Sequence, residues 1–436
     1  MKSIKSSIQL IGNNNKQLEQ FNNLLTTPLV IDSRLQGILE QFSFTFYMRL
    51  NRLQSLLMVE RGYEYSIQSQ RYCTYDKEYV ECILDKATDS KDIIEFGEEA
   101  IDLYNDLINA GIPNEDARDY LPLIMPCYNT VTMNGYQLLD FVRLCILNSD
   151  IFSNVTNDLL KIFKLNDFIT NAIVEKGSIC KDIIDKTLDN SFDILYNERK
   201  NMIFEKDNLR NGAIGALTCT HEDSLEGINT MIDNRGEDGV NKIIDVVVCK
   251  NKHTSVLEHA HYKYATTTTL PAYNQFGRHR IQFVQRESIN SLKNRYMELK
   301  TFDTINASTQ CKETKEIINT FKPRIDALLV KSQELMKKYM YLGDFTTSFI
   351  LFGFDVRLLI SDNIVNFCHI TQKRLCNRAQ YAINQLVKEI MFKLIDNVPD
   401  LKNILIELGS PDCIRNKKCN ELKPCKSNRN VVTLFK

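Results

Sequence analysis

The feature that most constrains the fold is a faint internal repeat. Motifs of the first half return in the same order in the second half, and the distance between the two copies grows along the chain. Insertions in loops produce such a drift, because loops tolerate changes in length. We therefore expect two units with one plan. The matching motifs are Leu39-Glu40 with Leu257-Glu258, Phe44 and Phe46 with Tyr262 and Tyr264, Arg71-Tyr72 with Arg295-Tyr296, and Arg143-Leu144-Cys145 with Arg374-Leu375-Cys376.

Each half begins with strand patterns and continues with helix patterns. Apolar residues alternate around Phe44 and around Tyr262, as they do in a half-buried strand. Pro271 is expected to end the second of these strands and to open a short helix that leads to Arg278. The predicted fold class is α+β, with two tandem units that each pack a twisted, mainly antiparallel sheet against long helices. The predicted helices are Ile94–Leu107, Tyr136–Phe163, Thr314–Lys338 and Asn363–Leu394.

The charged stretch Asn197–Asn211 is the expected junction of the two units. The predicted domains are residues 1–205, residues 206–410, and a Cys- and Lys-rich tail of residues 411–436. In the tail, Cys413, Cys419 and Cys425 are spaced C-x5-C-x5-C, which differs from the usual CxxC pair of a zinc site, and no histidine lies near them. We expect reduced thiols and no metal there; a structural metal is the alternative.

Composition excludes several classes of function. The charge is balanced, with 54 Lys and Arg against 55 Asp and Glu, which argues against broad nucleic-acid binding. No stretch approaches the roughly 18 apolar residues of a membrane span. The beginning of the chain lacks the apolar core of a signal peptide, and the thirteen cysteines are dispersed. We expect a soluble, cytoplasmic protein with no nucleic-acid or membrane partner.

Residues suited to binding anions are concentrated in the second half. Four of the six histidines lie between His253 and His279, and no histidine precedes His221. The triplet Arg278-His279-Arg280 offers guanidinium groups for phosphates and delocalised anions, with an imidazole between them. Arg374 and Arg378 are four positions apart on a predicted helix, where they share one face. Taken alone, each of these features is as compatible with a solvated basic surface as with a binding site.

The order of these motifs resembles that of the flavin-dependent thymidylate synthases. The matching residues are His253, Ser255, Glu258 and His259, then Gln275, Arg278-His279-Arg280 and, after seven residues, Ser288, and finally Arg374-Leu375-Cys376-Asn377-Arg378-Ala379-Gln380. The resemblance covers the second half well, and the first half is similar to the same family more faintly. It implies a methyltransferase that turns dUMP into dTMP, with FAD as cofactor and with NADPH and methylenetetrahydrofolate as co-substrates.

The resemblance also implies a role for individual residues. Arg374 is expected to be catalytic, by polarising the pyrimidine, and to bind substrate. The residues expected to bind the flavin are His253, Ser255, Glu258, Arg278, His279, Arg280, Asn363 and His369. The residues expected to bind dUMP are Gln275, Glu287 and Ser288, together with Ser69, Gln70, Arg71, Arg118 and Arg143 of the first half. Counting back from Arg295 places Lys293, instead of Ser288, at the signature serine.

The first half departs from the family at the flavin motif, where it reads Val59-Glu60-Arg61. It keeps the uninterrupted spacing from Arg61 to Ser69 and to Arg71-Tyr72, and it keeps Ala117-Arg118 ahead of Leu121-Pro122. We therefore hypothesise a division of labour, in which the second half binds flavin and the first half contributes nucleotide-binding residues. Because the family forms tetramers, two such chains would imitate one as a homodimer. The alternative is that the first half is only a scaffold.

Three other functions are suggested by parts of the sequence. A thymidylate synthase with a cysteine nucleophile is suggested by Pro126-Cys127, but the half that contains Cys127 has no histidine to activate a thiolate. RNA binding through Arg278–Arg280 is disfavoured by the neutral overall charge. The remaining alternative is a non-catalytic relic that binds flavin or nucleotide in a structural or regulatory role.

Overall fold

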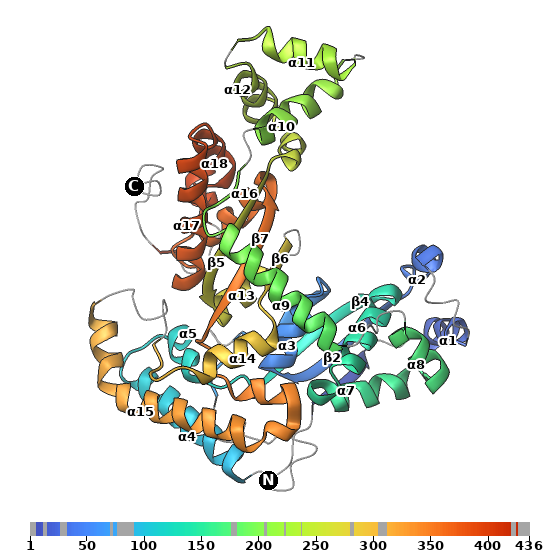
Figure 1. Cartoon of the computed structure of the whole chain (residues 1–436), viewed down its shortest axis with the longest axis vertical. Coiled ribbons are helices and arrows are strands. Elements are labelled where there is room, and N and C mark those ends of the chain that lie inside the picture. Colours follow the sequence, from blue (N-terminus) through green and yellow to red (C-terminus); the bar gives the residue numbers. More distant parts are fainter. Residues whose placement is uncertain are drawn as a thin grey trace. The chain divides into compact units, whose positions relative to one another are not determined.

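The computed structural model describes residues 6–11, 15–26, 33–69, 73–75, 91–175, 181–204, 207–221, 224–236, 238–279, 283–303, 312–419 and 424–425. The chain forms two compact units (Figure 1). Unit 1 consists of residues 1–189 and 288–354, and unit 2 consists of residues 190–287 and 355–436. The units thus do not follow the order of the chain, because part of the second half packs with the first half. The domain boundaries at residues 205 and 410 stay predictions from the sequence.

Unit 1 contains an antiparallel sheet in the order β1-β2-β4-β3. Its strands are β1 (Ser7–Ile11), β2 (Ser43–Asn51), β3 (Glu64–Ile67) and β4 (Pro126–Asn134). The alternation seen in the sequence places Phe44 and Phe46 of β2 in the core, where they are 4% and 0% exposed. The other elements are α1 (Asn15–Leu24), η2 (Ser33–Leu35), α2 (Gln36–Leu39), α3 (Arg52–Val59), α4 (Lys91–Asn109), α5 (Asn114–Ala117), η4 (Arg118–Tyr120), α6 (Gly135–Leu147), α7 (Ser149–Ile162), α8 (Asp167–Glu175), α14 (Ile289–Met297), α15 (Lys312–Lys338) and η7 (Met340–Phe349).

The two longest helices of unit 1, α4 and α15, come from different halves of the chain and lie side by side (Figure 1). Three ion pairs join them, from Arg324 to Asp106 at 2.7 Å, from Lys331 to Glu99 at 2.6 Å and from Lys338 to Asp92 at 2.7 Å. After these helices the two halves meet in a short antiparallel bridge between Pro122 and Leu351. Packing of this kind explains why residues 288–354 belong to unit 1.

Unit 2 contains an antiparallel sheet in the order β5-β7-β6. Its strands are β5 (His261–Thr269), β6 (Phe283–Arg286) and β7 (Asp355–Asn363). Tyr262 and Tyr264 of β5 are buried, as the alternation predicts. The helical elements are α10 (Asp207–Thr218), α11 (Leu225–Asp233), α12 (Gly239–Ile244), η5 (Asp245–Lys250), η6 (Thr254–His259), α13 (Leu270–Gly277), α16 (Ile364–Arg374), α17 (Tyr381–Asn397), α18 (Leu401–Gly409) and α19 (Asp412–Arg415). Helix α9 (Lys181–Glu198) spans the boundary of the two units.

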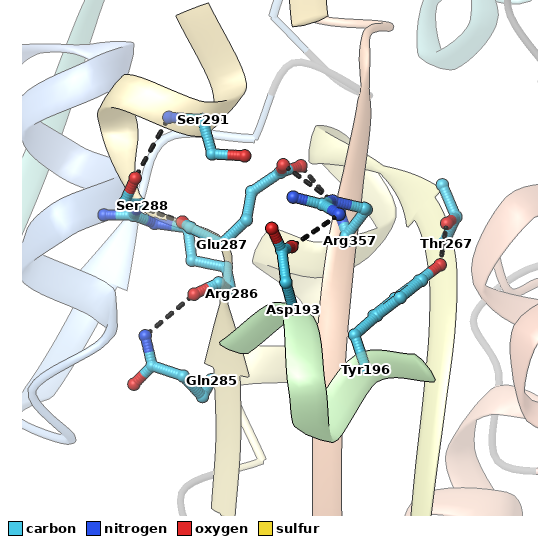
Figure 2. A network of polar contacts seen from close by, with 9 residues as sticks. All are labelled: Asp193, Tyr196, Thr267, Gln285, Arg286, Glu287, Ser288, Ser291 and Arg357. Carbon is cyan, nitrogen blue, oxygen red and sulfur yellow. Dashed lines mark hydrogen bonds and ion pairs between the residues drawn. The ribbon is translucent and has the colours of Figure 1, made fainter. Parts of the chain in front are cut away.

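The end of α9 packs on one face of the unit 2 sheet, where Phe192 contacts Ala265 and Leu359. Beside this contact Arg357 of β7 binds Asp193 at 2.9 Å and the carboxylate of Glu287 at 2.9 Å (Figure 2). The guanidinium also lies over the Tyr196 ring at 5.3 Å. The Glu287 side chain is fully buried, and a buried carboxylate is costly unless it is paired. The ion pair with Arg357 offsets this cost.

The predicted fold class is confirmed, since two antiparallel sheets pack against helices in two units. The predicted helices Ile94–Leu107 and Thr314–Lys338 are confirmed as α4 and α15. Pro271 does open a short helix, α13. Two predicted long helices are each divided, Tyr136–Phe163 into α6 and α7 and Asn363–Leu394 into α16 and α17.

The structure also fixes the register of the repeat. Strand β2 corresponds to β5 position by position, so that Asn51 at the end of β2 matches Thr269 at the end of β5. Strand β4 corresponds in the same way to β7, and each ends in an asparagine that caps the next helix, Asn134 for α6 and Asn363 for α16.

These caps correct one predicted match. Arg143 follows the capping residue Asn134 by nine positions, whereas Arg374 follows the capping residue Asn363 by eleven. The predicted match between the two arginines is therefore wrong by two positions. Since each helical residue turns by about 100°, the two side chains leave their helices in nearly opposite directions.

None of the helices in the described ranges combines the length and the apolar character needed to cross a membrane.

Candidate functional site

The strongest cluster of predicted site residues lies in unit 2, where the end of α13 meets the end of α16. Arg374, in the last turn of α16, donates from Nε to His279 Nε2 at 2.9 Å. Its Nη2 group lies 3.3 Å from the main-chain oxygen of Gln275, and Nη1 lies 3.4 Å from Gln275 Oε1. Three predicted residues that are up to 99 positions apart in the sequence are thereby brought together.

Local sequence explains why these side chains meet. Pro271 at the start of α13 fixes the helical backbone without losing a hydrogen bond, and the eight-residue helix delivers Gln275 and then His279 to one end. Asn363 accepts a hydrogen bond from the Asn366 amide at 2.9 Å and begins α16. At the other end of α16, Asn384 of α17 donates to the main-chain oxygen of Arg374 at 2.7 Å. Both ends of the helix that carries Arg374 are therefore held.

The imidazole of His279 is neutral in this arrangement. Burial, together with the positive charge of Arg374 and the nearby His369, lowers its pKa to about 3. A neutral ring can accept the hydrogen bond from Arg374 Nε, which a protonated ring cannot. His369 lies on α16 with its ring centroid 6.2 Å from that of His279, and it is exposed. The corner thus presents a fixed guanidinium beside two imidazoles.

Gln380 belongs to this cluster although the sequence reasoning did not select it. It is buried at the start of α17, and its side-chain oxygen accepts from the side-chain nitrogen of Gln275. The bond fixes the Gln275 amide so that its oxygen faces Arg374. Gln380 lies in the stretch from Arg374 to Gln380, whose sequence resembles the family. Its hydrogen bond with Gln275, 105 residues away, could be found only from the folded structure.

The residues predicted to bind the flavin lie on two neighbouring segments of unit 2. His253 precedes η6, Ser255 and Glu258 lie on it, and all three are exposed. Helix α16, which carries His369, packs against η6. Arg278 is half-buried at the end of α13, and Arg280 lies outside the described residues.

His259, which also matches the family, packs over Gly215 of α10. A Cβ added at Gly215 would lie only 2.8 Å from the His259 ring, so a larger residue at this position would force the ring to shift.

Two predicted substrate residues have structural partners. Glu287 accepts from the amide and Nε of Arg357, each at 2.9 Å, as Figure 2 shows. Ser288 caps α14 by accepting from the Ser291 amide at 3.0 Å. The described residues between His279 and Asn294 therefore contain β6 and the start of α14. Lys293, the other candidate for the signature serine, pairs with Asp344 at 3.2 Å.

The first-half residues lie in unit 1. Ser69 is half-buried after β3, and Gln70 and Arg71 lie outside the described residues. Arg118 is buried, with its guanidinium 5.8 Å from the centre of the Phe352 ring. Arg143 pairs with Asp140 at 3.0 Å. Their predicted role in nucleotide binding stays a prediction.

In the part of the chain that the structure describes, no group of three or more His, Cys, Asp or Glu side chains could hold a metal ion. The tail cysteines Cys413, Cys419 and Cys425 are exposed free thiols. Cys127 is fully buried in β4, beside Ser55 and Asn129.

Comparison with known proteins identifies the family of the chain. The family model described as thymidylate synthase complementing protein matches residues 3–149 and again residues 204–400. The chain is also similar to flavin-dependent thymidylate synthases from Pyrococcus furiosus, at 34% identity over 129 residues, and from Geobacter sulfurreducens, at 35% over 116 residues. The corresponding protein of Saccharolobus solfataricus is 34% identical over 124 residues.

These matches cover 27%, 25% and 26% of this chain and 53%, 50% and 48% of the three relatives. The chain thus spans about half the length of the curated relatives it matches. The family model, in contrast, matches most of the chain, and it does so in two consecutive regions, as expected for a tandem repeat. The chain therefore belongs to the flavin-dependent thymidylate synthase family.

Proposed function

We propose that the chain catalyses the reductive methylation of dUMP to dTMP, with FAD as cofactor, NADPH as reductant and methylenetetrahydrofolate as carbon donor. The observation that carries this proposal is the cluster of Arg374, His279 and Gln275 in unit 2. These are residues that the family resemblance selects, they come from different elements, and direct hydrogen bonds join them.

The donor set of this corner fits a flavin. A reduced flavin carries negative charge on its ring system and a flavin dinucleotide carries phosphates, so it needs fixed cations and hydrogen-bond donors. Arg278, Arg374 and the exposed imidazole of His369 supply these, and Ser255 and Glu258 offer further polar groups on the neighbouring η6. When bound, the flavin would supply the hydride chemistry.

The chain's own residues would bind and orient the substrate. Arg374 remains protonated, so its guanidinium can stabilise negative charge that develops on a pyrimidine carbonyl. Because Gln275, His279 and Asn384 of α17 already hold it, it reorganises little during the reaction. The fixed amide of Gln275 would hydrogen-bond the pyrimidine, and the neutral His279 keeps Arg374 in place without competing for a proton.

The first-half residues Ser69, Gln70, Arg71, Arg118 and Arg143 are proposed to contribute to nucleotide binding, as are Glu287 and Ser288. The proposed assembly is a homodimer that imitates the tetramer of the family, and the proposed location is the cytoplasm. The two consecutive regions that match the family model support the homodimer, because a chain with two family regions needs fewer copies.

The test is an absorbance spectrum of the purified protein, followed by a titration with dUMP in which the flavin spectrum is the reporter. We expect bound FAD whose spectrum changes on addition of dUMP, and dTMP formation when NADPH and methylenetetrahydrofolate are supplied. Protein that contains no flavin and takes none up would refute the proposal and leave the non-catalytic relic as the better description.

A further inference from the structure

Strand β7 of unit 2 carries a buried polar pair where unit 1 has an apolar pair. Asp362 is 1% exposed, and Tyr262, its antiparallel partner on β5, is fully buried. The corresponding partners in unit 1 are Met133 and Phe44, which are also buried. The same place in the fold therefore accepts apolar side chains, so the fold alone does not explain the carboxyl group of Asp362.

The hydrogen bonding of this pair is incomplete. The Oδ2 atom of Asp362 and the hydroxyl of Tyr262 have no hydrogen-bond partner among the described residues. Burial raises the pKa of Tyr262 and the carboxyl of Asp362 raises it further, because the two groups lie near each other. A buried polar group without a partner costs free energy, and departures of this kind are expected at functional sites.

Asp362 also changes how the next helix begins. In unit 1, Asn134 and Gln137 form a capping box at the start of α6, in which Gln137 Oε1 accepts from the Asn134 amide at 3.0 Å. Counted from the capping asparagines, the counterpart of Gln137 is Asn366. In unit 2 the oxygen of Asp362 takes this role, since its Oδ1 accepts from the Asn363 amide at 2.9 Å. The cap of α16 therefore does not use the side chain of Asn366.

The side chain of Asn366 is instead oriented by Asp362. Its Nδ2 donates to Asp362 Oδ1 at 3.0 Å, so its amide oxygen points away from that carboxyl group. Asn366 is half-buried, and it lies three positions after Asn363 and three before His369 on α16. Residues at this spacing are neighbours on a helix surface. Asn366 thus lies between two residues that are expected to bind the flavin.

We propose that Asn366 is a further flavin-binding residue and that Asp362 is its positioning residue. An amide oxygen accepts hydrogen bonds from N–H groups, which the flavin ring system carries, and from hydroxyl groups, which its ribityl chain carries. Because Asp362 holds the amide by its nitrogen, the oxygen is oriented before the ligand arrives, and less side-chain freedom is lost on binding. The inference rests on the proposed function in that it takes the flavin as the ligand of this corner.

The experiment is a fluorescence titration of the full chain with FAD, combined with urea unfolding of each variant. Asp362→Met, which installs the residue of unit 1, should weaken FAD affinity about tenfold, and so should Asn366→Ala, because each removes one oriented hydrogen bond. The double variant should lose no more than either single variant, since both changes act through the same hydrogen bond. Asp362→Asn keeps an accepting oxygen and should bind FAD within about twofold of wild type.

Gln137→Met is the matched control, because it removes the side chain that completes the cap of α6 in unit 1. It should lower the free energy of unfolding and leave FAD affinity unchanged. Equal FAD affinities of wild type and Asp362→Met would overturn the inference. Losses that add in the double variant, or a loss of FAD affinity in Gln137→Met as large as that in Asp362→Met, would overturn it as well.

A second variant keeps the inference testable if Asp362→Met fails to fold. Tyr262→Phe, Asp362→Met and Asn366→Gln together reproduce the arrangement at the start of α6. The new glutamine would turn back to cap α16, so FAD affinity should again fall about tenfold. Unchanged FAD affinity in this folded variant would refute the assignment.

The outcomes separate this inference from the proposed function. If the protein forms dTMP while Asp362→Met and Asn366→Ala bind FAD as tightly as wild type, only the inference fails. If FAD binds through Asn366 in a protein that forms no dTMP, only the proposed function fails. A protein that takes up no FAD would refute both.

Discussion

Matching corners of the two units differ at one position, which is an aspartate in unit 1 and a histidine in unit 2. In unit 1, Asp140 of α6 binds Arg143 at 3.0 Å, lies 3.5 Å from Arg61 and accepts from the Tyr63 hydroxyl at 3.0 Å. Counted from the capping asparagines of α6 and α16, the counterpart of Asp140 is His369. Counted from the starts of α3 and α13, the counterpart of Arg61 is His279, one position away from the predicted match of Val59-Glu60-Arg61 with Arg278-His279-Arg280.

The difference bears on which copy of the duplicated site can bind an anionic cofactor. In unit 1 a carboxylate neutralises the cations of the corner from within the chain, so an anionic cofactor has less to gain there. In unit 2 the groups of His279 and Gln275 that hold the Arg374 guanidinium are neutral, and they do not cancel its charge. The comparison supports flavin binding in unit 2 alone.

The largest expected effect follows from replacing Arg374. Arg374→Leu should lower kcat/KM for dTMP formation by about 100-fold or more, because one preorganised charge at the reacting group is removed. Arg143→Leu removes an arginine of α6 in unit 1, although not one at the equivalent position, and should have a much smaller effect, since Asp140 already pairs with Arg143. Steady-state kinetics of both variants provide the check, and equal losses would erase the proposed difference between the two corners.

Replacing the acid of unit 1 should affect stability. In Asp140→Ala the buried hydroxyl of Tyr63 loses its acceptor and two arginines lose a partner, so we expect a loss of about 1–3 kcal/mol in the free energy of unfolding. The change at the equivalent position, His369→Ala, removes an exposed side chain and should cost less than about 0.5 kcal/mol. Urea unfolding of the two variants tests this; a larger loss for His369→Ala would contradict it.

Giving unit 2 the charge found in unit 1 should weaken cofactor binding. In His369→Asp a carboxylate would stand on α16 close to His279 and Arg374, where it would compete with an anionic flavin for the guanidinium. We expect FAD affinity to fall about tenfold, which corresponds to about 1.4 kcal/mol. Fluorescence titration with FAD measures the change, with His369→Asn as the uncharged control. Identical affinities of the two variants would show that charge at this position is unimportant.

A further expected effect concerns the dependence of stability on pH. The pKa of His279 is about 3 in the folded chain and near 6.5 in an unfolded chain, so between these values the unfolded state binds the additional proton. His279 therefore lowers stability as the pH falls from about 6.5 towards 3, by at most about 1.4 kcal/mol per pH unit. Burial raises the pKa of Asp362 to about 7, which acts in the opposite direction.

The contribution of His279 is isolated by comparing wild type with His279→Asn. The difference in their free energies of unfolding should change with pH below about 6.5 and should be constant above it. A difference that does not depend on pH between about 6.5 and 4 would mean that His279 is not held neutral in the folded protein.

Much of this architecture could be predicted from the sequence, because alternation and helical spacing report which faces are buried. Phe44, Phe46, Tyr262 and Tyr264 were assigned correctly to buried strand faces, and α4 and α15 were recognised over most of their length. Helix boundaries inside Tyr136–Phe163 were missed because apolar periodicity continues across the short break at Asn148.

The site was predicted less completely, for a physical reason. Motif order selected Gln275, His279 and Arg374, but the contribution of Gln380 depends on a contact between α13 and α17 that no local pattern encodes. The match of Arg143 with Arg374 was inferred from a short shared motif, whereas the asparagine caps that define the register were not compared.

The most direct test of the central claim is the stoichiometry of FAD in the purified protein, measured from flavin absorbance and protein concentration. The account predicts one FAD per chain, with the flavin lost in His369→Asp more readily than in Asp140→Ala. Two FAD molecules per chain would show that unit 1 is also a working flavin site, and absence of FAD would show that neither unit is.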